Sequence, residues 1–226
     1  MLEKAPGDDE LRRRAAEAAL SVVEPGMKLG IGTGRTAEHF VRLLAGRVRQ
    51  GLDVVGVPTS QRTADLARAE GVPLTTLDEE PALNLTVDGA DEVDRSLRLI
   101  KGGGGALTRE KVLAGASRRF VCIVDDSKLV GMLGEFPLPI EVIPMAQEFV
   151  AGKLVKLRGR PVWREDFVTD NGNHILDVHG LQIGNPIELE SRLNQVPGIV
   201  TVGIFAQRPA DVLLIAGDDG VRELRV

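Results

Sequence analysis

Asp88, Asp91, Glu110, Lys101 and a run of four glycines lie close together at residues 86–111. Asp88 and Asp91 follow an apolar run, and Lys101 leads directly into the glycines. Glu110 comes next, in the expected first turns of a helix. Carboxylates can carry protons, and an ammonium group beside exposed backbone amides can stabilise a developing oxyanion. The segment therefore predicts a reaction that moves a proton beside an oxyanion.

Each of these residues has a plainer explanation when it is taken alone. Asp-Gly pairs are common in turns, and a helix dipole favours an acid such as Glu110 in the first turn. Glycine runs are often flexible loops, and a neighbouring lysine can be a solvated charge. Because all of these residues occur in one short segment, we favour a catalytic role for them. Lys101 and the amides of Gly102, Gly103 and Gly104 would be the oxyanion donors.

A second loop, Gly-Thr-Gly-Arg-Thr at residues 32–36, is suited to binding an anion. It follows an expected strand and opens an expected helix, so its amides, including that of Gly34, and the positive helix end would face a ligand. Thr33 and Thr36 add hydroxyl groups, and Arg35 adds a charge. We favour a phosphate monoester as the ligand.

Two alternatives for this loop stay open. With Ala37 the loop also matches the Gly-x-Gly-x-x-Ala pattern of dinucleotide-binding proteins, which needs an acid at the end of the next strand. That strand ends at residues 57–60, Val-Pro-Thr-Ser, without an acid. The other alternative is a tight turn that binds nothing.

Strands and helices alternate through the first half of the chain, which predicts a parallel sheet with right-handed crossovers. In such sheets ligands bind beyond the carboxyl ends of the strands. Thr33, Thr59 and Asp88 follow three of these ends, so we expect them in one crevice. The expected strands are residues 27–31, 52–57, 72–77, 83–87 and 119–124.

The second half predicts the β-α-β-β-α-β order of ferredoxin-like domains. Its expected elements are strand 140–143, helix 144–157, strand 161–164, strand 167–178 broken by an Asn-Gly turn at 171–172, helix 186–193 and strand 199–206. A last apolar strand, 212–216, suits the first sheet better. We therefore predict a parallel-sheet, Rossmann-like α/β domain at 1–131 and 206–226, with an inserted ferredoxin-like α+β domain at 132–205.

The composition narrows the classes of function. The net charge of −5, the absence of tyrosine and the 3% of aromatic residues argue against nucleic acid as a partner. Cys122 lies in an apolar run and is expected to be a buried thiol. The three histidines lack metal-ligand spacing, so no metal is expected. We see neither a signal peptide nor an apolar run of membrane length, which predicts a cytoplasmic protein without a membrane partner.

Six motifs are spread over nearly the whole chain. They are Gly-Thr-Gly-x-Thr at 32–36, Val-Asp-Gly-Ala-Asp-Glu at 87–92, Lys-Gly-Gly-Gly-Gly-Ala-Leu-Thr-Arg-Glu-Lys at 101–111, Leu-Pro-Ile-Glu-Val-Ile-Pro at 138–144, Thr-Asp-Asn-Gly-Asn at 169–173 and Pro-Gly-Ile-Val-Thr-Val-Gly at 197–203. In all six the chain resembles ribose-5-phosphate isomerases of the A type.

The resemblance implies the interconversion of D-ribose 5-phosphate and D-ribulose 5-phosphate in the non-oxidative pentose phosphate pathway, without a cofactor. It implies that Glu110 is the base that carries a proton between C1 and C2 through a cis-enediolate. Asp88, Asp91 and Lys101 would complete the site, and Lys128 would contact the substrate. Members of the family are commonly homodimers or homotetramers.

Two departures from the family concern the phosphate. Arg35 stands where a serine is frequent, and Arg12 lies near a phosphate-contacting lysine of some members. Both keep or add positive charge, which leaves the individual phosphate donors open. Ribose 5-phosphate is mostly cyclic in water, so the ring must also be opened, and Asp88 is our candidate for that step.

Two other classes of protein are alternatives. One is a non-catalytic sugar-phosphate sensor, which would keep the phosphate loop without needing Glu110 or Lys101. The other is a sugar-phosphate deaminase or a coenzyme A transferase on a related fold.

Overall fold

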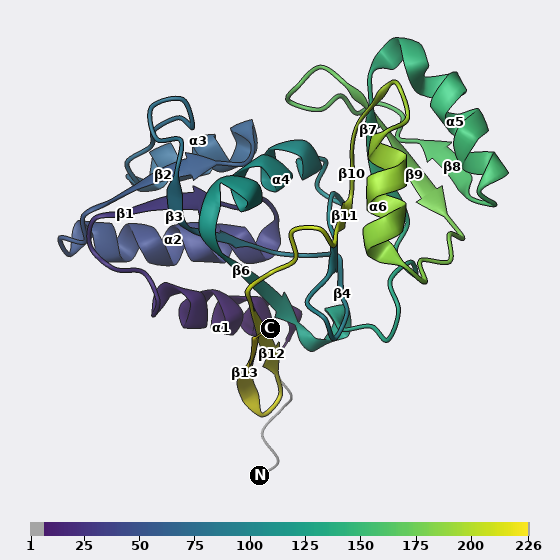
Figure 1. Ribbon diagram of the computed structural model, residues 1–226. Helices are drawn as coiled ribbons and strands as arrows, with labels where there is room; N and C mark the ends of the chain where they lie inside the picture. The colour runs from purple at the N-terminus through teal and green to yellow at the C-terminus, as the bar shows by residue number, and fades with distance from the viewer. Residues whose placement is uncertain (1–6, 226) are drawn as a thin grey trace. The chain divides into compact units, whose positions relative to one another are not determined.

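The computed structural model describes residues 7–225 and divides the chain into two compact units (Figure 1). The first unit holds the chain up to Gly89, Leu113–Lys128 and the chain from Ala210 onward. The second unit holds Ala90–Val112 and Leu129–Pro209. Along the chain, both segments of the second unit therefore lie between segments of the first.

The first unit is built on a six-stranded sheet with the strand order β13-β12-β6-β3-β1-β2. Its strands are β1 Met27–Ile31, β2 Val54–Pro58, β3 Leu83–Asp88, β6 Ser117–Asp125, β12 Val212–Gly217 and β13 Gly220–Arg225. All neighbours pair in parallel except β12 and β13. The predicted parallel sheet is confirmed, and so is the return of strand 212–216 to it.

Two features of this sheet differ from the prediction. The terminal strand β13 was not predicted, because most of its side chains are exposed and it lacks an apolar run. The expected strand at 72–77 was wrong, since only an isolated bridge joins Leu74 to Gly56. Val72 packs into the core and Leu74 against it, while Pro73 has no N–H for a ladder. The apolar pattern there reflects packing rather than strand pairing.

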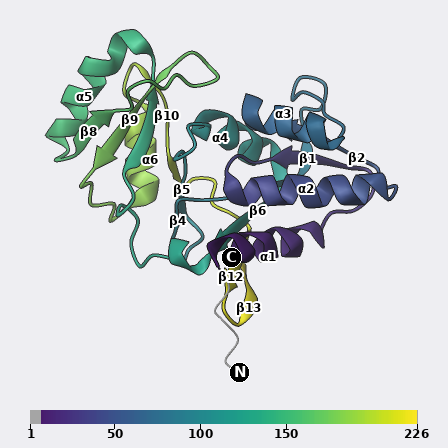
Figure 2. The same ribbon diagram turned by 180° about the vertical axis from the view of Figure 1, so that it is seen from behind.

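Three helices belong wholly to the first unit: α1 Asp8–Leu20, α2 Arg35–Arg49 and α3 Gln61–Glu70. Helix α2 buries Phe40, Val41 and Leu44 in the main core. Helices α1 and α2 lie side by side in both views (Figures 1 and 2). Helix α3 ends at Gly71, whose φ of 82° is the left-handed conformation that glycine adopts at helix ends.

The second unit contains a four-stranded antiparallel sheet with the order β10-β7-β9-β8. Its elements, in chain order, are β7 Leu138–Val142, the 3-10 helix η2 Pro144–Ala146, α5 Gln147–Lys156, β8 Arg160–Trp163, β9 His174–His179, α6 Pro186–Asn194 and β10 Ile199–Val202. This connectivity is the predicted ferredoxin-like one.

The loop before β9 departs from the expected strand at 167–178. The turn at 171–172 forms, with a φ of 77° at Gly172, but no strand precedes it. Backbone bonds from Gly172 to Thr169 and from Thr169 to Asn173 close the segment on itself. The turn signal was therefore right, and the first flanking strand was wrong.

A small three-stranded sheet, also in the second unit, was not predicted. It joins β4 Glu92–Val93, β5 Leu99–Ile100 and β11 Ile204–Phe205 in the order β11-β5-β4. The expected strand at 199–206 splits at Gly203 into β10 and β11. A Cβ at Gly203 would lie 2.4 Å from the carbonyl oxygen of Lys101, so a side chain could not be accommodated there.

This pairing explains why segment 90–112 groups with the second unit, whereas the sequence placed it with the first. Strand β5 pairs with β11 on one side and with β4 on the other, and the amide of Lys101 donates to the carbonyl of Gly203 at 2.9 Å. The boundaries 132 and 205 stay a prediction, because a compact unit need not be a domain that folds alone.

Candidate active site

The loop at residues 32–36 in the first unit is joined to the segment that follows β2 by a cluster of hydroxyl groups. The Oγ1 of Thr33 lies 2.7 Å from the Oγ1 of Thr59, 2.7 Å from the Oγ of Ser60 and 3.0 Å from the Oγ1 of Thr63. Thr63 also donates to the carbonyl of Gly32 at 3.0 Å. The hydroxyl of Thr33 thus fixes the loop, and the amides beyond it are better placed to bind an anion.

The sequence did not assign this task to Ser60 or Thr63. Ser60 is the N-cap of α3, and its side chain accepts a hydrogen bond from the amide of Thr63. A serine shortly after a strand is a preferred N-cap residue, and this signal could have located Ser60.

Asp88 is the last residue of β3 and lies at the same end of the sheet as the loop at residues 32–36. It is 1% exposed, and its Oδ1 accepts hydrogen bonds from the amides of Gly89 at 2.8 Å and Thr33 at 3.2 Å. A Cβ on Gly32 would lie 2.1 Å from this oxygen, so the approach requires glycine. The structure brings Thr33, Thr59 and Asp88 together, as their positions at strand ends predicted.

The other predicted phosphate contacts are on the same unit. Gly34 is the N-cap of α2 with a φ of 113°, Arg35 is exposed, and Thr36 is half-buried in the first turn. Lys128 ends the 3-10 helix η1 Asp126–Lys128 after β6 and is half-buried. Arg12 forms an ion pair with Asp8 at 3.5 Å.

In the second unit, Lys101 and Glu110 form a buried ion pair. The Nζ of Lys101 lies 3.3 Å from the Oε2 of Glu110, and the two side chains are 3% and 4% exposed. The ring of Phe205 packs beside the ammonium group, with its centroid 5.6 Å from the Nζ. A carboxylate that can take a proton and a cation that can stabilise an oxyanion are thus adjacent.

Asp91 and the glycine run are joined by a hydrogen bond. The amide of Gly103 donates to the Oδ2 of Asp91 at 2.8 Å, and a Cβ on Gly103 would lie 2.6 Å from the Oδ1. The amide of Gly105 donates to the carbonyl of Gly102 at 2.9 Å and closes a turn in which Gly103 and Gly104 are exposed.

The first turn of α4, Leu107–Ala116, carries Glu110 and is fixed on both sides of it. Thr108 donates to the Oε2 of Glu141, and Arg109 donates to the Oδ1 of Asn171 at 2.9 Å. These contacts restrict rotation and sliding of the turn that presents Glu110.

Glu141 is fully buried in β7, and no role of its own was predicted for it. Its carboxylate also accepts hydrogen bonds from Thr169 at 2.9 Å, Asn171 at 3.1 Å and Asn173 at 2.8 Å. It therefore joins the loop at 169–173 to the start of α4. A single acid inside an otherwise apolar strand is the signal that could have found it.

Lys111 anchors the same turn from the other side. Its ammonium group forms an ion pair with Glu190 of α6, donates to the carbonyl of Ile204 and lies 4.6 Å from the ring centroid of Phe205. Burial lowers the pKa of Lys111, and the ion pair with Glu190 opposes that effect. Phe205 thus contacts both Lys101 and Lys111.

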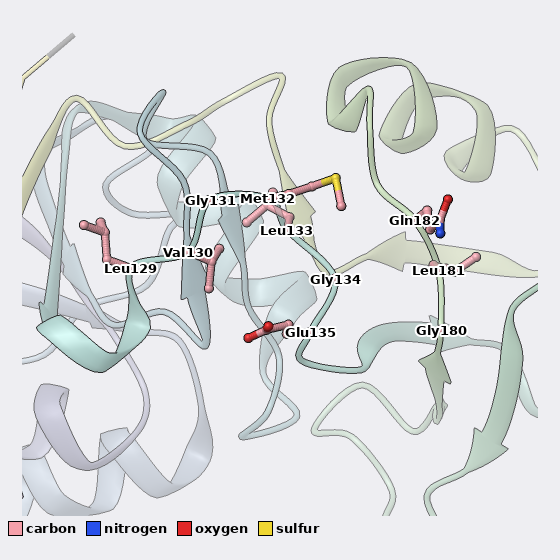
Figure 3. Close-up of a pocket in the computed structure, with 10 residues that line it drawn as sticks. All are labelled: Leu129, Val130, Gly131, Met132, Leu133, Gly134, Glu135, Gly180, Leu181 and Gln182. Atoms are coloured by element: carbon pink, nitrogen blue, oxygen red, sulfur yellow. The ribbon is translucent and has the colours of Figure 1, made fainter.

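The second unit also contains an open cavity of about 610 Å³ that none of the predicted site residues lines (Figure 3). Its walls are residues 129–135 and 180–182. The buried carboxylate of Glu92 holds this wall by accepting hydrogen bonds from the amides of Gly134 and Phe136.

Within residues 7–225, no three His, Cys, Asp or Glu side chains gather so that they could hold a metal ion. Over the same residues, no helix is both long and apolar enough to cross a membrane. Cys122 is buried, as the sequence predicted.

The family model of ribose 5-phosphate isomerase A, also called phosphoriboisomerase A, matches residues 55–220. The chain belongs to this family. It is an isomerase, and the interconversion of ribose 5-phosphate and ribulose 5-phosphate is its activity. The sensor, the deaminase and the transferase are no longer alternatives.

Solved structures of ribose 5-phosphate isomerase A agree over nearly the full length. The enzyme from Neisseria gonorrhoeae is 40% identical, with a TM-score of 0.94 and coverage of 98% of this chain and 99% of that one. The enzyme from Methanocaldococcus jannaschii is 42% identical, with a TM-score of 0.93 and coverage of 97% and 100%. A third structure, of D-ribose-5-phosphate isomerase in complex with phospho-erythronic acid, is 38% identical, with a TM-score of 0.94 and coverage of 98% and 100%.

Proposed function

We propose that this isomerase acts through a cis-enediolate, with Glu110 as the base that moves the proton between C1 and C2. The observation that carries the proposal is the buried pair of Glu110 and Lys101, whose charged atoms lie 3.3 Å apart. Removing a proton next to a carbonyl group places negative charge on oxygen. The ammonium group of Lys101 and the backbone amides of the turn at residues 102–105, which we call the glycine turn, are donors suited to that charge.

The other roles follow from the chemistry that each remaining group offers. Asp88, held by two amides at the end of β3, is our candidate for opening the sugar ring. Asp91 fixes the glycine turn through the amide of Gly103. The amides of residues 34–36 and the hydroxyl group of Thr36 bind the 5-phosphate, and Lys128 contributes a further substrate contact.

Several finer assignments belong to the same proposal. We propose a cytoplasmic homodimer or homotetramer that works in the non-oxidative pentose phosphate pathway and needs neither a metal nor an organic cofactor. The relative that binds phospho-erythronic acid suggests a probe. The carboxylate of this acid resembles the enediolate in charge, so we expect the compound to compete with substrate here as well.

The direct test is an isomerase assay on ribose 5-phosphate after exhaustive treatment with a chelator. We expect full activity, because every proposed step uses a side chain or a backbone amide of the chain. Loss of activity with the chelator, and its return when a divalent ion is added, would refute the metal-free mechanism. Absence of isomerase activity under all conditions would refute the function itself.

Replacing Thr36 with valine should weaken the binding of substrates that carry a phosphate. The change keeps the volume of the side chain and removes one hydroxyl donor, so we expect KM for ribose 5-phosphate to rise about tenfold or more, as the loss of a hydrogen bond to a charged group predicts. Ribose without the phosphate provides the control. It should be a very poor substrate for both proteins, and the variant should not make it worse. An equal loss on both substrates would show that Thr36 acts on the fold rather than on the phosphate.

A further inference from the structure

Arg164, just after β8, donates hydrogen bonds to the glycine turn on the side opposite Asp91. Its Nη1 donates to the carbonyl oxygens of Gly102 and Gly103, each at 3.2 Å, and its Nη2 donates to the carbonyl oxygen of Gly102 at 3.3 Å. Arg164 lies about 60 residues further along the chain, and the sequence assigned it no function. Its contacts are to the same peptide groups that we propose for the oxyanion.

These contacts set the direction of two amides. In a trans peptide the carbonyl of one residue and the N–H of the next point in opposite directions, and the described residues contain no cis peptide. A guanidinium that holds the carbonyls of Gly102 and Gly103 therefore turns the N–H groups of Gly103 and Gly104 away from itself. The N–H of Gly103 does point away, and it reaches the Oδ2 of Asp91 at 2.8 Å. The N–H of Gly104 is turned to that same side.

The guanidinium is itself held in a defined position. Its Nε and Nη2 donate to the two carboxylate oxygens of Asp177 in β9, at 2.8 and 2.6 Å. This two-point pairing fixes the plane of the guanidinium, which a lysine could not do. The guanidinium lies over the ring of Phe167, whose centroid is 5.4 Å from the Cζ of Arg164.

The same ring closes the other end of the turn. A Cβ on Gly105 would lie 2.1 Å from the ring of Phe167, so the turn packs directly on it, and Gly105 has a φ of 79° that favours glycine. The turn is thus fixed by Arg164, Phe167 and Asp91 together.

We propose that Arg164, oriented by Asp177, is a positioning residue that aligns the glycine turn so that the amide of Gly104 can donate to the oxyanion. This inference rests on the proposed function and adds to it the group that directs the donors. Because Asp177 neutralises its charge, Arg164 acts through the geometry of the peptide groups rather than as a further cation.

The test compares Arg164→Met with Arg160→Met. Arg160 is an exposed arginine of β8, so the control removes the same kind of side chain four residues earlier in the chain. We expect kcat to fall about 10- to 100-fold in Arg164→Met with KM within about threefold, because misaligned donors lose stabilisation mainly in the transition state. The control should keep wild-type kcat.

Four further measurements separate positioning from general damage to the fold. Arg164→Lys should lose nearly as much activity as Arg164→Met, and added guanidinium ion should restore part of the kcat of Arg164→Ala. The affinity for phospho-erythronic acid should fall in parallel with kcat. Thermal unfolding should show that each variant is folded under the assay conditions.

The amides themselves provide a measurement that does not need the reaction. In Arg164→Met, the NMR signals of the Gly103 and Gly104 amides should shift and their hydrogen exchange should accelerate, while those of Arg160→Met should match the wild type. Unchanged amides, or a folded Arg164→Met with kcat within about twofold of wild type, would overturn the positioning role. An inactive wild-type protein would instead refute the proposed function, so the two failures are distinguishable.

Discussion

Replacing Glu110 with glutamine is expected to lower kcat by at least about 100-fold while substrate still binds, because general-base catalysis contributes roughly 10²–10⁴-fold. Glutamine keeps the shape of the side chain and removes its basicity. The first turn of α4 is held by Thr108 and Lys111 on either side, so the amide should occupy the position of the carboxylate. The loss should therefore appear in the chemical step.

The measurement is steady-state kinetics combined with the exchange of the C2 proton of the substrate with solvent. Both rates should fall in parallel in Glu110→Gln. The matched control is Glu148→Gln, which changes an exposed glutamate in the first turn of α5 and should keep wild-type kinetics.

A comparison with Asp88→Asn decides between two assignments of roles. If Asp88 opens the ring, its variant should be slow on the cyclic substrate and less affected on an open-chain analogue. Near-normal kcat in Glu110→Gln, together with loss of C2 proton exchange in Asp88→Asn, would require the two roles to be exchanged.

The second large effect is expected for Lys101→Met, which should lower kcat by about 100- to 1,000-fold. Loss of one oxyanion donor typically costs on the order of 3 kcal/mol in the transition state. Methionine keeps most of the length of lysine, and its sulfur packs favourably on an aromatic ring such as that of Phe205, 5.6 Å from the lysine Nζ. The fold around the position should therefore survive.

The control for Lys101→Met is Lys156→Met, which changes an exposed lysine near the end of α5. Binding of phospho-erythronic acid should weaken in Lys101→Met in proportion to kcat, since the acid carries the charge that Lys101 is proposed to stabilise. A folded Lys101→Met that kept both kcat and inhibitor affinity would remove Lys101 from the catalytic group.

Both predictions depend on how rigidly the two side chains are held. Lys101 is fixed through its backbone, since its amide donates to Gly203 at 2.9 Å. Glu110 is fixed through its helix, by the contacts of Glu141 with Thr108 and of Glu190 with Lys111. Catalytic groups held in this way need little rearrangement during the reaction. Electrostatic stabilisation of the transition state is most effective when the donors are fixed in advance.

The sequence by itself determined the class of fold and the family. Alternating strands and helices predicted the parallel sheet, because each apolar run has the length and spacing of a buried strand or a helix face. Glycine runs and strand-end acids are local signals, so the segments at 32–36 and 86–111 could be located without coordinates. Glu110 was also predicted to lie in the first turns of a helix, and it lies in the first turn of α4.

Only the tertiary structure decided which side chains meet and what holds them. Three sets of contacts join residues from different parts of the chain. They are the ion pair of Lys101 with Glu110, the hydrogen bonds around the hydroxyl group of Thr33, and the hydrogen bonds from Arg164 to the glycine turn. The split of strand 199–206 depends on Gly203 lying against the backbone of Lys101. Such contacts follow from how the elements pack, and packing depends on residues far apart in the chain, which local propensity and periodicity do not contain.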